Sequence, residues 1–234
     1  MVRQIQKLIR EKAWYFTALA MLLIIGGMLV LANEKGAAIL FFNDHRSAGG
    51  DIFFRWVTRL GEEPVYVLAA IYFLFIRYRY VVMLPVIGLA VTLVAFATKT
   101  FFAMPRPLSY FRSLNMEEKL KLIEGVDVYT GATSLPSGHT MSAFAIFGFL
   151  AFCLPNRLLS LFFLALACLV GVSRIYLVQH FLSDVWLGAL LGTLISVFAY
   201  AAIQTRPQDP VQSRLDRSLA WWETHQSANN SDAI

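Results

Sequence analysis

Charged residues are scarce in this chain. Only 15% of its 234 residues are Asp, Glu, Lys or Arg, whereas 58% are hydrophobic, and the mean hydropathy is +0.60. Soluble domains usually contain about 25% charged residues. A soluble protein of this length would need more polar surface to cover its core. The shortage of charge therefore argues against a soluble domain and favours a chain embedded in a membrane.

The chain has few cysteines and no cluster of acidic residues. The two cysteines, Cys153 and Cys168, both lie inside apolar runs, which is typical of small buried hydrophobes rather than of a disulfide or a metal pair. The sequence also lacks an acidic cluster of the kind that suits Mg²⁺. We therefore predict neither a bound metal ion nor a cofactor.

The net charge of +5 does not point to a nucleic-acid partner. The lysines and arginines are spread between the apolar runs instead of forming a stripe, which nucleic-acid binding would favour. Cationic loops near anionic lipid head groups account for the basic balance. We expect the lipid bilayer to be the partner and expect no nucleic acid, and the sequence does not indicate an oligomeric state.

Six apolar stretches divide the chain and predict an all-α fold, a bundle of six transmembrane helices over 1–205. The polar segment 206–234 is predicted to be a partly disordered cytoplasmic tail. A spanning helix needs about 20 residues, so the second, fourth and fifth stretches must be extended by adjoining residues. We expect the first to be retained rather than cleaved as a signal peptide. The stretches are Trp14–Ala32, Pro64–Ile76, Tyr80–Thr98, Met141–Leu154, Leu158–Val172 and Val185–Ile203.

Two connecting segments are predicted to form further helices. In Asp51–Leu60 the apolar residues fall on one helical face, with Arg55 and Arg59 on the other, which is typical of an interfacial helix lying along the membrane. The segment Asn115–Glu124 lies in the longest polar loop. It is predicted to form a short amphipathic helix that ends at Gly125.

Chemically useful residues stand at the ends of the apolar stretches. His180 and Asp184 are four residues apart, the spacing that places two side chains on one face of a helix. A carboxylate there can accept a hydrogen bond from one imidazole nitrogen, which fixes the tautomer and leaves the other nitrogen free to attack. Taken alone, the pair is more often an ion pair at a helix start.

Two other segments offer groups that bind anions. His139 follows a Ser-Gly turn, whose N–H groups and following helix start favour an anion, and the histidine can donate a proton to a departing alkoxide. Lys99, Arg106 and Arg174 carry fixed charge, and the guanidinium fork suits a phosphate. Each of these signals alone also fits a loop-to-helix junction or a membrane anchor.

Together these residues closely resemble the signature of the type 2 phosphatidic acid phosphatase (PAP2) superfamily. Its pattern is Lys-x6-Arg-Pro, Pro-Ser-Gly-His and Ser-Arg-x5-His-x3-Asp, and every position is matched in Lys99–Pro107, Pro136–His139 and Ser173–Asp184. The resemblance implies a metal-independent reaction in which His180 attacks phosphorus and forms a phosphohistidine. It implies that Asp184 orients His180 and that His139 protonates the leaving alcohol and then activates water. The phosphoryl oxygens would be held by Lys99, Arg106, Ser137, Gly138 and Arg174.

The resemblance implies a membrane phosphatase that acts on a lipid phosphate or diphosphate. Undecaprenyl diphosphate, phosphatidylglycerol phosphate, phosphatidic acid and the phosphates of lipid A are all open as substrates. Two alternatives remain: a lipid phosphotransferase that uses the same phosphohistidine, and a non-catalytic lipid-binding membrane protein. If the spans alternate, the lysines and arginines divide equally between the two sides, and the basic cluster before the first span decides the orientation. We expect both termini in the cytoplasm of a bacterial inner membrane protein and a catalytic pocket at the extracytoplasmic helix ends.

Overall fold

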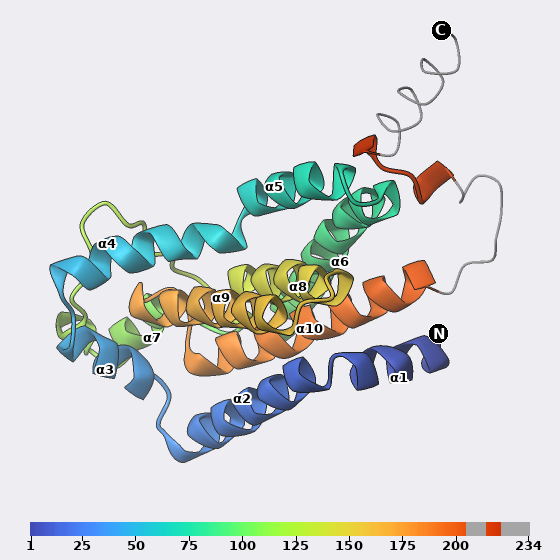
Figure 1. The fold of residues 1–234 in the computed structure, drawn as a ribbon. Helices are drawn as coiled ribbons and strands as arrows, with labels where there is room; N and C mark the ends of the chain where they lie inside the picture. The colour runs from blue at the N-terminus through green and yellow to red at the C-terminus, as the bar shows by residue number, and fades with distance from the viewer. Residues whose placement is uncertain (205–213, 221–234) are drawn as a thin grey trace, which may run out of the picture.

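The computed structural model of the chain describes residues 1–204 and 214–220. Within them the chain forms helices and loops and no strand, as the sequence predicts (Figure 1). The expected disorder at the end of the tail over 206–234 falls on residues outside the described ones. The α-helices are α1 (Val2–Glu11), α2 (Ala13–Ala32), α3 (Ala37–Asp44), α4 (Ala48–Val57), α5 (Glu63–Leu74), α6 (Tyr78–Phe102), α7 (Pro107–Ser113), α8 (Gly138–Cys153), α9 (Arg157–Tyr176) and α10 (Leu182–Gln204), and the 3₁₀ helices are η1 (Thr58–Gly61) and η2 (Glu117–Lys119).

Each of the six predicted apolar stretches lies largely in one helix: α2, α5, α6, α8, α9 or α10. Four of these helices, α2, α6, α9 and α10, are long and apolar enough to cross a membrane. The other two are shorter, with 12 residues in α5 and 16 in α8. The chain is therefore built as a membrane protein, and the count of six spans stays a prediction.

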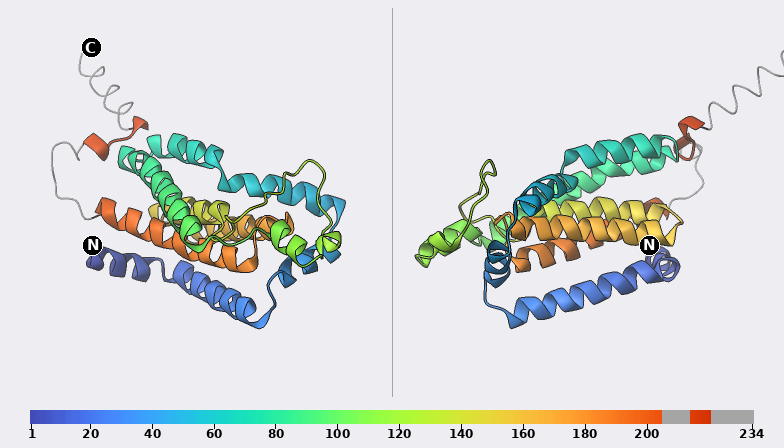
Figure 2. Two further views of the ribbon diagram at one scale, coloured as in Figure 1. Left: turned by 180° about the vertical axis from the view of Figure 1, so that it is seen from behind. Right: turned by 60° about the vertical axis from the view of Figure 1, so that its left-hand side comes forward.

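The helix α8 lies at the centre of the bundle. Figures 1 and 2 show α8, α9 and α10 in the middle, with α2 on one side and α5 and α6 on the other. From Thr140 to Phe152 every residue of α8 except Ser142 is buried. The surrounding helices instead expose large apolar side chains, such as Leu31 on α2 and Phe96 on α6. Such surfaces are unfavourable in water and are typical of contact with lipid.

Glycines allow α10 to pack closely against α8. A methyl group added to Gly188 would lie 2.8 Å from the carbonyl oxygen of Ser137, and one added to Gly192 would collide with the carbonyl oxygen of Met141. Small residues at such positions let two helix backbones approach, which is a common way to hold membrane helices together. This contact fixes the start of α8 beside the start of α10.

The predicted helix over Asn115–Glu124 is wrong. Only the single turn η2 is helical there. Leu120 and Ile123 pack into two different apolar clusters, so they cannot share one helical face. The backbone N–H of Lys121 also donates to Oδ1 of Asn43 (2.5 Å), which replaces a helical hydrogen bond. Tertiary contacts therefore override the local helix signals in this loop.

The helix predicted over Asp51–Leu60 exists but begins earlier and ends as a 3₁₀ turn, and its position at a membrane interface stays a prediction. It is α4, which continues into η1, and the Ser47 hydroxyl caps it by accepting from the N–H of Gly50 (3.1 Å). Ile52 and Trp56 are both 62% exposed, so part of its apolar face is open to the surroundings. The helices α1, α3 and α7 are not among those that the sequence predicts.

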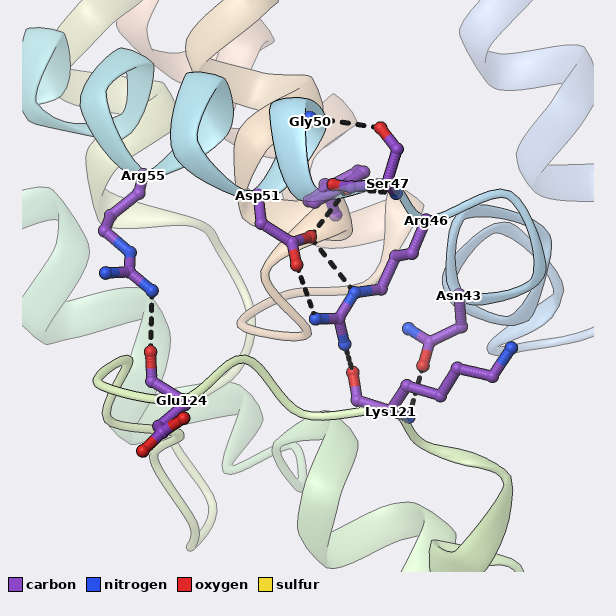
Figure 3. A network of polar contacts seen from close by, with 9 residues as sticks. Asn43, Arg46, Ser47, Gly50, Asp51, Arg55, Lys121 and Glu124 are labelled. Atoms are coloured by element: carbon purple, nitrogen blue, oxygen red, sulfur yellow. Dashed lines mark hydrogen bonds and ion pairs between the residues drawn. The ribbon is translucent and has the colours of Figure 1, made fainter.

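A polar network ties α4 to the end of α9 (Figure 3). Arg46 donates to both carboxylate oxygens of Asp51, from Nε (3.1 Å) and from Nη2 (2.8 Å). The hydroxyl of Tyr176, the last residue of α9, donates to the same carboxylate (2.8 Å). Arg55 donates to the carbonyl of Glu124 (2.6 Å) in the neighbouring loop. The segment that leads into η1 is thus held at several points.

We predict that Gly192→Ala destabilises the bundle because its methyl group has no space against α8. Overpacking of this kind costs about 1–3 kcal/mol, which corresponds to a fall of roughly 2–12 °C in melting temperature for a chain of this size. Gly49→Ala is the matched control, since nothing lies within 4 Å of the added methyl group. Thermal unfolding of both variants in detergent measures the difference, and equal melting temperatures would contradict this account of the α8–α10 contact.

Candidate active site

The residues singled out from the sequence meet at one end of the bundle. They are contributed by helix ends: Lys99 lies in the last turn of α6, His139 in the first turn of α8, Arg174 in the last turn of α9 and Asp184 in the first turn of α10. The remaining cation, Arg106, immediately precedes α7.

His180 and Asp184 are in contact, although not on one helix. His180 lies before the start of α10, in a turn where Val178 has a positive φ of 58°. Nδ1 of His180 is 3.4 Å from Oδ2 of Asp184, and each residue is only 2% exposed. The same Oδ2 accepts from the N–H of Phe181 (2.9 Å) and from the hydroxyl of Ser134 (2.5 Å). These bonds fix the carboxylate so that it both caps α10 and faces the imidazole.

The other imidazole nitrogen of His180 faces a cation. Nη1 of Arg106 is 3.4 Å from Nε2 of His180 and also donates to the carbonyl of Gln179 (3.2 Å). Nε of Arg106 donates to the hydroxyl of Thr133 (3.3 Å). The guanidinium is thus held over the nitrogen that Asp184 does not contact.

Two further cations approach the same place. A methyl group added to Gly138 would lie 3.8 Å from Nζ of Lys99, so the ammonium group sits beside the Ser-Gly turn. Arg174 is 5% exposed, and its Nη1 donates to the hydroxyl of Thr58 (2.7 Å). Its Nε is buried and has no hydrogen-bond partner among the described residues. Among the described residues, Arg106, Arg174 and Lys99 form no ion pair with a carboxylate.

The Ser-Gly turn is fastened to α10. The N–H of Ser137 donates to the carbonyl of Asp184 (3.0 Å), and its hydroxyl accepts from the hydroxyl of Thr140 (2.8 Å) at the start of α8. The next two amides, of Gly138 and His139, lie in the first turn of α8, where a helix has no carbonyl of its own to bind them. These amides are suited to an anion.

His139 contacts a residue that no motif contains. Its Nε2 lies 3.3 Å from Oε1 of Glu62, at the start of α5. The sequence analysis also missed Ser134 and Thr58, which bind Asp184 and Arg174. Ser134 lies three residues before Ser137, and this proximity to a motif could have marked it as a site residue. Nothing in the sequence marks Thr58 or Glu62, because their role depends on how the segment over 48–62 folds back onto α8 and α9.

Burial lowers the pKa of His180 from 6.5 to about 4, and the positive charges of Arg174 and Arg106 act in the same direction while Asp184 opposes them. The imidazole is therefore neutral at pH 7. The hydrogen bonds assign its proton to Nδ1, facing Asp184, and leave the lone pair on Nε2. Because the unfolded chain binds this proton more readily, His180 makes the free energy of unfolding fall as the pH drops from about 6.5 to 4.

This arrangement can hold a tetrahedral oxyanion. Arg106 contacts a neutral imidazole whose free nitrogen can attack, and Arg174, Lys99 and two helix-start amides lie at the same end of the bundle. In the part of the chain that the structure describes, no three His, Cys, Asp or Glu side chains gather to hold a metal ion.

A cavity of about 730 Å³ adjoins Asp184. Leu29 and Val30 of the apolar helix α2 line it, together with Phe181. Lys35 stands in the same cavity with its ammonium group 4.6 Å from the centre of the Phe181 ring. The cavity therefore lies between Asp184 and the apolar helix α2, and neither the three cations nor the two histidines of the site line it.

The chain is similar to phosphatases in sequence. The sequence model of the PAP2 superfamily matches residues 65–208. Lipid phosphate phosphatase 1 of Arabidopsis thaliana is 35% identical over 124 residues, which is 44% of this chain and 38% of that protein. The chain spans less than half the length of each of the curated relatives that it matches.

Solved structures share the arrangement of the helices. Aquifex aeolicus LpxE is 28% identical, with a TM-score of 0.56 over 69% of this chain and 91% of its own. A transmembrane PAP2-type phosphatidylglycerolphosphate phosphatase of Bacillus subtilis has a TM-score of 0.61 over 85% of this chain and 98% of its own. At 21% identity, the second likeness concerns the fold alone.

We predict that His180 stays neutral far below the usual range of histidine. In nitrogen-15 NMR of histidine-labelled protein in detergent, its imidazole should keep the pattern of an Nδ1–H neutral ring from pH 8 to 5 and titrate near pH 4. A His180→Asn variant assigns the signals. A titration midpoint above pH 6, or an Nε2–H ring at neutral pH, would contradict the geometry described for this pair.

Proposed function

The chain belongs to the PAP2 superfamily, and from this membership and the geometry of the site we propose that it hydrolyses the phosphate or diphosphate group of a membrane lipid. The reaction uses no metal ion and passes through a phosphohistidine. The observation that carries the proposal is the set of three cations, Lys99, Arg106 and Arg174, gathered around His180 without a carboxylate partner among the described residues. Cations held away from water require an anion, and a phosphoryl group matches them in charge and shape.

In the first step Nε2 of His180 attacks phosphorus, and the bond between phosphorus and the leaving oxygen breaks. Asp184 accepts from Nδ1–H and stabilises the positive charge that develops on the ring. His139 gives a proton to the leaving oxygen, which departs as an alcohol or, from a diphosphate, as a lipid phosphate. The cations and the amide of Gly138 stabilise the charge on the phosphoryl oxygens.

In the second step water attacks the phosphohistidine. His139, now neutral, takes a proton from the attacking water, the bond between nitrogen and phosphorus breaks, and His180 recovers its lone pair. Inorganic phosphate leaves. Two histidines thus divide the nucleophilic and the proton-transfer work, so the sequence needs no further base.

The lipid nature of the substrate is supported by the cavity beside Asp184. Because residues of α2 and Asp184 line the same cavity, a lipid chain could lie there against apolar side chains, beside the residue that faces His180. The names of two relatives point to a lipid phosphate and to phosphatidylglycerol phosphate. Undecaprenyl diphosphate, phosphatidic acid and the phosphates of lipid A stay open beside them.

We further propose that the chain makes six spans, with both termini in the cytoplasm and the site on the opposite side. The helix α1 is amphipathic and carries Arg3, Lys7 and Arg10, so it can lie along an anionic inner surface. It lies at the opposite end of the bundle from α3 and α7, which border the site (Figure 1).

Phosphate release tests the proposed activity. Purified protein in detergent with EDTA should release phosphate from at least one of phosphatidic acid, phosphatidylglycerol phosphate and undecaprenyl diphosphate. His180→Ala should abolish release and any acid-labile phosphoenzyme, because no other imidazole occupies its place. The matched control is His45→Ala, since the His45 ring bonds to the carbonyl of Phe41 at the end of α3, belongs to none of the three motifs and should keep wild-type activity when replaced.

Substantial release by His180→Ala would contradict the nucleophile assignment. A strict need for Mg²⁺ would contradict the metal-free mechanism. Transfer of phosphate to an added acceptor lipid, with little free phosphate, would identify a phosphotransferase instead.

Labelling of introduced cysteines tests the orientation. A membrane-impermeant maleimide should label Leu122→Cys in intact cells, because Leu122 is 46% exposed in the loop that borders the site. It should label Arg3→Cys only after the membrane is opened. The reverse pattern would place the site in the cytoplasm.

A further inference from the structure

The segment Thr58–Glu62 belongs to none of the sequence motifs and precedes the region, 65–208, that the superfamily model matches. It nevertheless contacts two of the residues assigned to the site. Thr58, at its start, accepts a hydrogen bond from Arg174, and Glu62, at its end, contacts His139. A short segment that reaches two charged side chains of a site is placed to organise it.

Close packing fixes the position of this segment. A methyl group added to Gly61 would lie 2.8 Å from the carbonyl oxygen of His139 and 3.2 Å from its Cβ, so the two backbones are in direct contact. Upstream, Arg46, Asp51 and Tyr176 hold α4 against the end of α9 (Figure 3). The carboxylate of Glu62 is therefore presented to His139 from a segment that is fixed at both ends.

The contact between Glu62 and His139 is polar and partly open. Oε1 of Glu62 lies 3.3 Å from Nε2 of His139, and the two side chains are 37% and 33% exposed. Glu62 immediately precedes α5, but its side chain makes no capping hydrogen bond there. Its carboxylate therefore contacts His139 and does not cap α5.

We propose that Glu62 is a positioning residue for His139. Its carboxylate accepts the Nε2–H of His139, which holds the ring in place and keeps that proton on Nε2 throughout the reaction. Nδ1 is then the nitrogen that gives its proton to the leaving oxygen and later takes one from the attacking water. This assignment rests on the proposed function for its chemical part and on the geometry for the hydrogen bond.

The negative charge of Glu62 would favour the protonated form of the His139 ring. Burial disfavours a positive imidazolium ring at His139, and the charges of Arg174, Lys99 and Arg106 act in the same direction. A general acid must nevertheless carry a proton that it can donate. A carboxylate bonded to the far nitrogen offsets the cations, as Asp184 does for His180. The site would then contain two histidines, each with its own carboxylate.

A double-mutant cycle separates positioning from simple structural support. We expect Glu62→Ala to lower kcat by roughly 10- to 100-fold, a part of the roughly 10²- to 10⁴-fold that general acid–base catalysis contributes, with KM changed by less than about threefold. In a His139→Ala background the same substitution should have almost no further effect, because Glu62 acts only through that ring. Equal losses in both backgrounds would overturn the proposal.

The matched pair for charge is Glu62→Gln and Glu63→Gln. Both remove one negative charge at the start of α5, but no hydrogen bond or ion pair connects Glu63 with His139. We expect a loss of kcat with Glu62→Gln, wild-type activity with Glu63→Gln and similar melting temperatures for both. Wild-type kinetics with Glu62→Gln and Glu62→Ala would overturn the proposal while the phosphatase assignment stood.

A second measurement does not depend on activity. Nitrogen-15 NMR should show the neutral His139 ring as the Nε2–H form in the wild type, and Glu62→Ala should shift the ring toward a mixture of both forms. If the wild type released no phosphate from any lipid, the proposed function would fail and this spectrum would still decide the contact. An Nδ1–H ring in the wild type, or one unchanged by Glu62→Ala, would overturn the positioning role.

Discussion

The close approach of α10 to α8 is the constraint on which the site depends. Gly188 and Gly192 leave no side chain between the two backbones, so the start of α8 lies directly beside the start of α10. The hydrogen bond from Ser137 to the carbonyl of Asp184 is possible only at this separation. It joins the Ser-Gly turn, with its anion-binding amides, to the carboxylate that faces His180. The close packing that these two glycines allow between α8 and α10 thus sets the distances within the polar site.

The electrostatics of the site follow from an uneven distribution of carboxylates. Asp184 and Glu62 are each bonded to a histidine, whereas Lys99, Arg106 and Arg174 form no ion pair within the described residues. The arginines bind neutral acceptors instead, hydroxyl groups and a carbonyl, which hold them in place without cancelling their charge. The site therefore keeps a net positive charge for an anion while its histidines keep local negative partners.

Sequence periodicity and motif spacing predicted most of this architecture. The apolar stretches lie in helices because membrane helices are specified by composition, and the contact of His180 with Asp184 follows from a short separation. The prediction of a helix over 115–124 was wrong because Leu120 and Ile123 pack into separate apolar clusters. Glu62 could not be found because it meets His139 across 77 residues of chain. Local signals do not encode such a contact, which exists only after Gly61 packs against α8.

The burial of α8 also has a consequence for the order of assembly. During synthesis α8 is made before α9 and α10, the two helices that cover it most extensively. Until α10 arrives, the Ser-Gly turn lacks its acceptor on Asp184, and the chain lacks His180 altogether. The reactive centre is therefore completed only when the last helix enters the bundle. A chain stopped at the end of α9 has all three cations but not His180, so under the mechanism that we propose no partly synthesised chain would be active.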